Sequence, residues 1–118
     1  MESRSGLRGI HVCALLVAGG TVALLLSGAL VTTTGNGDSI PEWPSTPLLE
    51  GSIFEFSHRI TAAAIGCGSL ALALIASFAR DLPRGVRAVG FLTLAAVAIQ
   101  AGLGGLRVLA AAPGSGVP

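Results

Sequence analysis

The amino-acid sequence predicts an all-α membrane protein, a single domain of residues 1–118 with three spanning helices. Of these residues, 52% are hydrophobic and only 11% are charged. Soluble domains have about 25% charged residues, and a fold of this size exposes so much surface that it needs polar groups there. The composition therefore excludes a water-soluble domain and also a disordered chain. Seven scattered arginines form no basic patch, so we expect a lipid bilayer and no nucleic acid as partner.

Three uncharged apolar stretches, 12–31, 60–79 and 88–106, each have 19 or 20 residues. A helix needs about 20 apolar residues to cross a bilayer. The first stretch is too long for the 7–15-residue apolar core of a signal peptide, so we expect a retained helix. The second helix begins near residue 53, where Ser52 is a plausible N-cap. The predicted spans are therefore 12–31, 53–79 and 88–107.

The distribution of arginine predicts the orientation of the chain, because cytoplasmic segments are rich in basic residues. Five arginines lie in segments 1–11 and 80–87, whereas segment 32–52 has none. We therefore expect a cytoplasmic N-terminal tail (1–11), an outer loop (32–52), a cytoplasmic loop (80–87) and a flexible outer tail (108–118). Arg59 and Arg107 lie at the outer boundary, against this pattern, so the position of each requires a local structural explanation.

The start of the second helix carries three ionisable residues: Glu55, His58 and Arg59. Their spacing of three and four places them on one helix face, and His58 lies about 8–9 Å below the helix start. Ionisable groups in a membrane helix suggest function by default. Polar residues near helix ends also reach the interface at little cost. The alternative is therefore an interfacial cluster, in which Glu55 pairs with Arg59 and His58 lies at the headgroups.

Each residue of this cluster suits a particular chemistry. A neutral His58 imidazole can ligate a metal or haem iron, shuttle protons, or hydrogen-bond a neighbouring helix. Arg59 can pair with a haem propionate. In an apolar setting, Glu55 can accept or donate a proton.

Gln100 lies in the third span at about the same depth as His58, close to 9 Å from the outer boundary. A buried amide needs hydrogen-bond partners in lipid, and Gly102, Gly104 and Gly105 allow a neighbour or ligand to approach. Gln100 therefore favours a polar pocket shared with His58. The alternative for the glycines is an ordinary small-residue packing face.

The predicted outer loop combines turn residues with a stiff aromatic element. Gly35, Asn36 and Gly37 favour a turn, and Pro41 and Pro44 bracket Trp43. Tryptophan prefers the membrane interface. The loop is either a lid over a pocket or an interfacial anchor, and composition does not decide between them.

Together these segments resemble the N-terminal half of the heme A synthase family. The matching segments occur in the family's order and cover most of residues 20–109. They are Gly28-Ala29-Leu30-Val31-Thr32 with Thr34-Gly35-Asn36-Gly37, Pro41-Glu42-Trp43-Pro44, Glu55-Phe56-Ser57-His58-Arg59, and Gln100-Ala101-Gly102-Leu103-Gly104-Gly105-Leu106-Arg107-Val108.

The resemblance implies part of a four-helix-bundle-type haem-binding unit in the inner or plasma membrane. Family members oxidise the C8 methyl group of haem O to a formyl group, which gives haem A for cytochrome oxidase. By that resemblance, His58 is an axial ligand of haem iron and a catalytic residue together with Glu55. Arg59 and Gln100 bind the cofactor, which is haem b, haem O as substrate, or both.

Three departures from the family pattern accompany this resemblance. Ile40 and Thr46 stand near positions where many members have cysteines, so no redox pair is expected there. The sequence has three of the four helices of the family's N-terminal half. Its second histidine, His11, is at the opposite side of the membrane. The family's second half is missing. We therefore expect a second copy or a partner chain to complete the haem site. The alternatives are a non-catalytic haem-binding or electron-transfer module and an accessory structural subunit.

Overall fold

The computed structural model is built from three α-helices: α1 (Glu2–Thr33), α2 (Ile53–Phe78) and α3 (Arg84–Ala111). No strand occurs among the described residues. All three helices are long and apolar enough to cross a membrane, which confirms the predicted all-α membrane fold. The structure describes residues 2–37, 39–40, 43, 53–112, 114 and 116.

Helix α1 is longer than its predicted span. It begins at Glu2, so residues 2–11, predicted as a tail, continue the helix. This segment contains no proline to interrupt the backbone hydrogen bonds. The membrane-spanning part of α1 is therefore the continuation of a helix that starts near the N-terminus.

Two prolines explain the bounds of α3. The helix begins directly after Pro83, which has no N–H to offer to a helix interior. It ends at Ala111, and Ala112, the residue before Pro113, is extended with φ −64° and ψ 142°. The connection from α2 is therefore shorter than the predicted loop 80–87, and α3 continues into the predicted tail 108–118.

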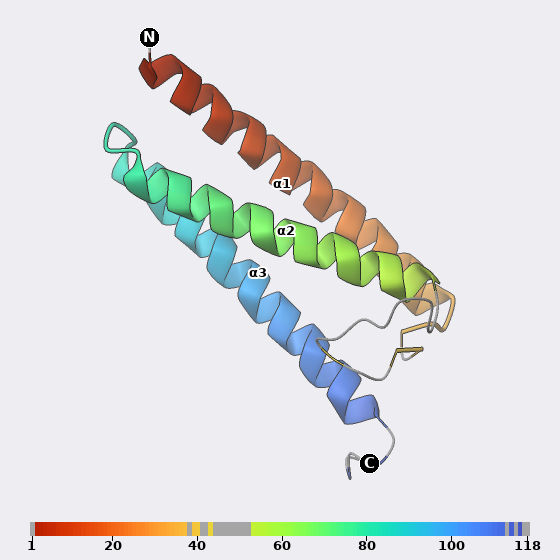
Figure 1. Cartoon of the computed structure of the whole chain (residues 1–118). Coiled ribbons are helices and arrows are strands. Elements are labelled where there is room, and N and C mark those ends of the chain that lie inside the picture. The colour runs from red at the N-terminus through yellow and green to blue at the C-terminus, as the bar shows by residue number, and fades with distance from the viewer. Residues whose placement is uncertain are drawn as a thin grey trace.

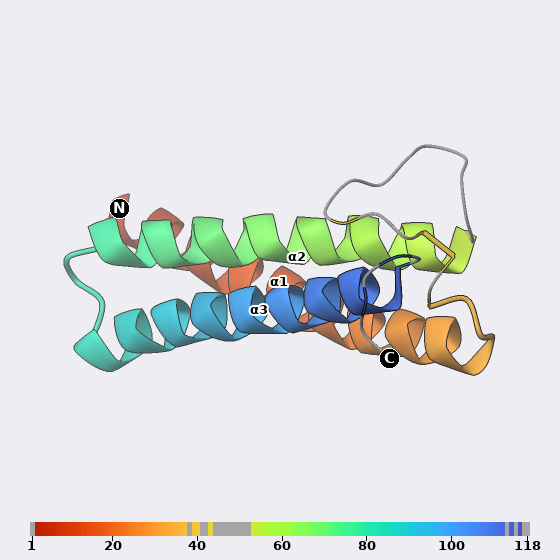
Figure 2. The same ribbon diagram turned by 90° about the horizontal axis from the view of Figure 1, so that it is seen from below.

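Helix α2 lies between α1 and α3 (Figure 1). Both outer helices pack against α2, and they make no contact with each other. Figure 2 shows the N-terminus at the end of the bundle where α2 turns into α3, and the C-terminus at the other end. We call the first end the turn end. The second, where α1 ends and α2 begins, is the loop end.

Small residues bring the helices together. On α1, Gly20 lies against Ile65 of α2, and a Cβ on Gly68 of α2 would lie 3.0 Å from a methyl group of Val17. On α3, Gly90 packs against Ala73 and its neighbouring turn on α2. Such close approaches are typical of membrane helices, which associate through packing and hydrogen bonds. Most large apolar side chains of the three helices remain exposed, as expected for surfaces that face lipid or another chain.

Helix α1 ends in a glycine cap that sends the chain across the loop end. Gly35 has φ 69°, its N–H donates to Thr32 O (3.2 Å), and the N–H of Asn36 donates to Val31 O (3.0 Å). These two bonds are the Schellman pattern, in which a left-handed residue ends the helix. The turn predicted at residues 35–37 is therefore the cap of α1.

Candidate functional site

The ion pair Glu55–Arg59 at the start of α2 holds the segment that follows α1. We call this ion pair the loop anchor. Arg59 Nη2 lies 2.7 Å from Glu55 Oε1. The other oxygen, Glu55 Oε2, accepts hydrogen bonds from Ser39 Oγ (2.6 Å) and Ile40 N (3.0 Å). Arg59 Nη2 also donates to Ile40 O at 2.6 Å. The loop anchor thus satisfies both backbone groups of Ile40, whose side chain is 1% exposed.

Local helix geometry explains the ion pair. Residues four apart lie on one helix face, and a carboxylate in the first turn interacts favourably with the helix dipole. Glu55 is 3% exposed, so its charge is compensated inside the protein. Ser52, the predicted N-cap of this helix, lies outside the described residues.

His58 lies one turn further along α2 and contacts α1. Its Nδ1 is 2.9 Å from the hydroxyl oxygen of Ser27. The ring lies against Gly28, where a Cβ would be 3.1 Å from His58 Cε1. His58 is half-buried and takes no part in the loop anchor. The structure thus brings Glu55, His58 and Arg59 to one end of α2, where Glu55 and Arg59 pair with each other and His58 contacts Ser27.

The loop also reaches α3. The indole of Trp43 packs directly on Gly105, in space that a side chain there would occupy. The guanidinium of Arg107 packs on Gly37, where a Cβ would lie 3.1 Å from Nη1. Arg59 and Arg107, the two arginines outside the charge pattern, therefore both contact this loop. Trp43 thus contacts another helix of the chain. Pro41 and Pro44, which flank Trp43 in the sequence, lie outside the described residues.

Replacing Gly105 with leucine is expected to displace Trp43 from α3, because the new side chain occupies the position of the indole. Trp43 is the single tryptophan, so its fluorescence reports this contact directly. We expect a red-shifted emission and stronger quenching by acrylamide. Gly104→Leu is the matched control, because nothing lies within 4 Å of a Cβ at that position. Equal spectra for the two variants would contradict the contact.

No contact among the described residues joins Gln100 to His58. Gln100 is exposed on α3, whereas His58 contacts α1, and α1 and α3 do not touch. Equal depth along two helices does not fix how each helix is rotated about its axis. No group of three or more His, Cys, Asp and Glu side chains that suits a metal ion occurs in the described part of the chain.

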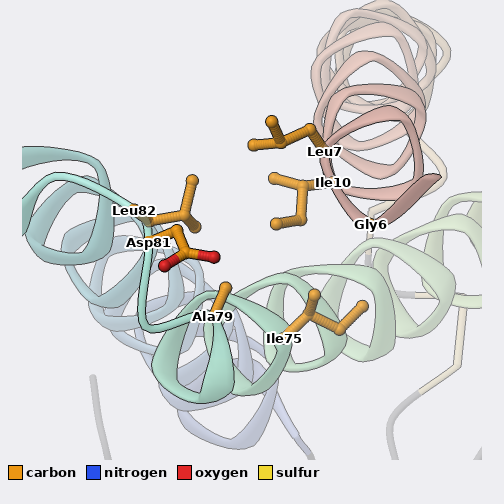
Figure 3. Close-up of a pocket in the computed structure, with 7 residues that line it drawn as sticks. All are labelled: Gly6, Leu7, Ile10, Ile75, Ala79, Asp81 and Leu82. Carbon is orange, nitrogen blue, oxygen red and sulfur yellow. The ribbon is translucent and has the colours of Figure 1, made fainter. Parts of the chain in front are cut away.

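Two cavities among the described residues lie away from His58. One of about 160 Å³ lies at the turn end, where Leu7 and Ile10 of α1 face Leu82 (Figure 3). Another of about 280 Å³ lies between α1 and α2, beside Cys13 and Gly68. Pockets for organic ligands usually measure about 300–1,000 Å³. Neither of these two cavities reaches that volume.

Three residues of this region were not predicted as parts of the site. They are Ser27, which contacts His58, and Ser39 and Ile40, which contact Glu55. Ser27 had a weak signal in the sequence, because it is a hydroxyl in an apolar span. Ile40 had none, since its backbone and not its side chain makes the hydrogen bonds.

Comparison with known proteins finds a partial similarity to the heme A synthase of Alkalihalophilus pseudofirmus. The two sequences are 30% identical over 104 residues, which cover 80% of this chain and 35% of that protein. The chain thus spans about a third of the length of this relative. No family model and no solved structure matches the chain. The similarity confirms the partial resemblance to heme A synthases that the motifs predicted.

Proposed function

We propose that this chain is the haem-binding part of a heme A synthase-type oxidoreductase of the inner or plasma membrane. In this proposal it acts with a second copy or a partner chain, and its substrate is haem O. The observation that carries the proposal is the placement of His58, which contacts the neighbouring helix through Nδ1. Nε2 would then be the nitrogen that holds the haem iron. The relative named heme A synthase supports the same reaction.

The side chains at the loop end suit haem as donors. His58 is half-buried and is not used by the ion pair beside it, so its imidazole is available as an axial ligand. Arg59 is the predicted partner of a propionate, and it would add this contact to those with Glu55 and Ile40. Bound haem supplies the redox centre for converting the C8 methyl group to a formyl group.

This oxidation removes four electrons and four protons from the methyl group and one water molecule, so a separate electron acceptor is required. The chain's own residues hold and shield the site. His58 positions the macrocycle, and the loop anchor keeps the loop seated, with Trp43 on Gly105. Glu55, predicted as a catalytic residue, is held by Ser39 and Ile40 in addition to Arg59. Exclusion of water from such a site strengthens its electrostatic interactions.

A second chain is part of the proposal because one chain leaves polar and open surfaces in the membrane. Gln100 is exposed about 16 Å from the end of α3. An amide facing lipid is costly, and a hydrogen bond to another helix satisfies it. Helix α3 has α2 as its one contacting helix in the described chain. We propose that the Gln100 amide binds either the same amide of a second copy or the haem held by that copy.

The proposed orientation places the loop end outside the cell and the turn end in the cytoplasm. It rests on the arginines of segments 1–11 and 80–87 and on the absence of arginine and lysine from 32–52. Haem O would then be oxidised near the outer face of the membrane. Labelling of a cysteine introduced at Ser115 in intact cells tests this orientation.

Haem titration of the full chain in detergent micelles tests the proposal. We expect the wild type to bind haem b with a Soret band, and His58→Ala to weaken binding at least about tenfold. His11→Ala is the control, because His11 lies in α1 toward the turn end. Sedimentation of the complex is expected to give two chains per haem. Gln100→Leu is expected to lower the dimer fraction while the chain stays helical.

Expression in a bacterial strain that lacks its own synthase tests the reaction. Formation of haem A from haem O, lost in His58→Ala, supports the enzyme. Bound haem without haem A would favour the electron-transfer module. A wild type that binds no haem would favour the accessory subunit and overturn the proposal.

A further inference from the structure

Ser27 of α1 contacts the nitrogen of His58 that faces away from the proposed iron. Its hydroxyl oxygen lies 2.9 Å from His58 Nδ1 and 3.0 Å from the carbonyl oxygen of Leu24 in the preceding turn. Ser27 is half-buried, as is His58. It is thus a polar group at the α1–α2 interface with a partner on each helix.

The chemistry of a hydroxyl couples the directions of these two hydrogen bonds. A serine has one hydroxyl hydrogen and two lone pairs. The hydroxyl has one hydrogen for two neighbours, so it donates either to Leu24 O or to His58 Nδ1. When it donates to Leu24 O, its oxygen accepts from His58, and Nδ1 carries the ring hydrogen. A neutral imidazole with its hydrogen on Nδ1 has its lone pair on Nε2.

We propose that Ser27 is a positioning residue that fixes the tautomer and orientation of His58 for haem binding. The inference rests on the proposed role of His58 as a haem ligand. Ligating histidines usually donate their second N–H to a protein acceptor, which fixes the ring and increases its donor strength. Here the acceptor is the Ser27 hydroxyl, itself held by Leu24.

Gly28, the neighbour of Ser27 on α1, also lies against the ring. A Cβ at this position would lie 3.1 Å from His58 Cε1 and 3.6 Å from Nδ1. The ring therefore lies against the α1 backbone, where rotation about its bonds is restricted. Ser27 and Gly28 together present Nε2 in one orientation.

The test compares Ser27→Ala, Ser27→Thr and Ser77→Ala in the full chain. Ser77 is the matched control, because its hydroxyl donates to Ala73 O within α2 at 2.7 Å. We expect Ser27→Ala to weaken haem b binding about 10- to 100-fold and to raise the reduction potential of the bound haem. The potential rises because a weaker imidazole donor stabilises ferric iron less. Threonine, which keeps the hydroxyl, is expected to restore both values.

The nitrogen NMR signals of His58 in the haem-free chain test the tautomer directly. His11→Gln leaves His58 as the one histidine, since the chain has two. We expect a protonated Nδ1 in this background and a mixture of tautomers after Ser27→Ala. If Ser27→Ala leaves the tautomer of His58, the haem affinity and the reduction potential unchanged, the proposed role of Ser27 is overturned. Loss of haem binding in His58→Ala would still support the proposed function in that case. A wild type that binds no haem overturns both proposals, and the NMR signals then report a structural bond alone.

Discussion

Replacing Glu55 with alanine is expected to lower the free energy of unfolding by about 3 kcal/mol and to release the loop. Removing one partner of a buried ion pair is costly because the other charge stays buried. Glu55 is 3% exposed, and it also accepts hydrogen bonds from Ser39 and Ile40. Unfolding of the purified chain in mixed micelles measures the loss of stability. Acrylamide quenching of Trp43 measures the release of the loop.

Arg59→Met and the double variant complete the test. The double variant buries neither charge, so we expect it to be more stable than the sum of the two single losses predicts, by about 1–3 kcal/mol. Losses that add within about 0.5 kcal/mol would contradict the coupling. Unchanged quenching of Trp43 in Glu55→Ala would show that the loop does not depend on the loop anchor.

Replacing Gly28 with leucine is expected to separate α1 from α2 at the loop end and to abolish haem binding. The first atom of a side chain at this position already lies 3.1 Å from His58 Cε1. The imidazole must move, which breaks its hydrogen bond with Ser27. Overpacking of this kind costs about 1–3 kcal/mol. Unfolding in mixed micelles and haem titration measure the two effects.

Gly19→Leu is the matched control for this variant. Gly19 lies in the same helix, and nothing lies within 4 Å of a Cβ there. We expect Gly19→Leu to retain the wild-type stability and haem affinity, apart from a small gain in helix propensity. If Gly28→Leu behaves like Gly19→Leu, His58 does not depend on close contact with α1.

The ion pair at the start of α2 shows what can be predicted from the sequence alone. Glu55 and Arg59 are four residues apart, and this spacing alone places them together on one helix face. The three spans could likewise be predicted, because the length and apolarity of a segment decide whether it can cross a membrane. These predictions succeed because the interacting atoms belong to the same short segment.

The partners of these residues could not be predicted in the same way. Ile40 joins the loop anchor through its backbone, which is identical in every non-proline residue and leaves no signal in the sequence. Gln100 was expected to share a pocket with His58, but it is exposed on α3. Depth follows from counting residues, whereas the direction of a side chain depends on how the helix is rotated against its neighbours.

The sequence by itself determined a membrane protein of three helices, the shared face of Glu55, His58 and Arg59, and a partial likeness to heme A synthases. Tertiary structure alone decided that His58 contacts Ser27, that Trp43 lies on Gly105, and that α1 and α3 stay apart. The physical reason is the range of the forces involved. Hydrophobicity and helix periodicity act within a segment, but contacts between segments depend on where small residues let two helices approach.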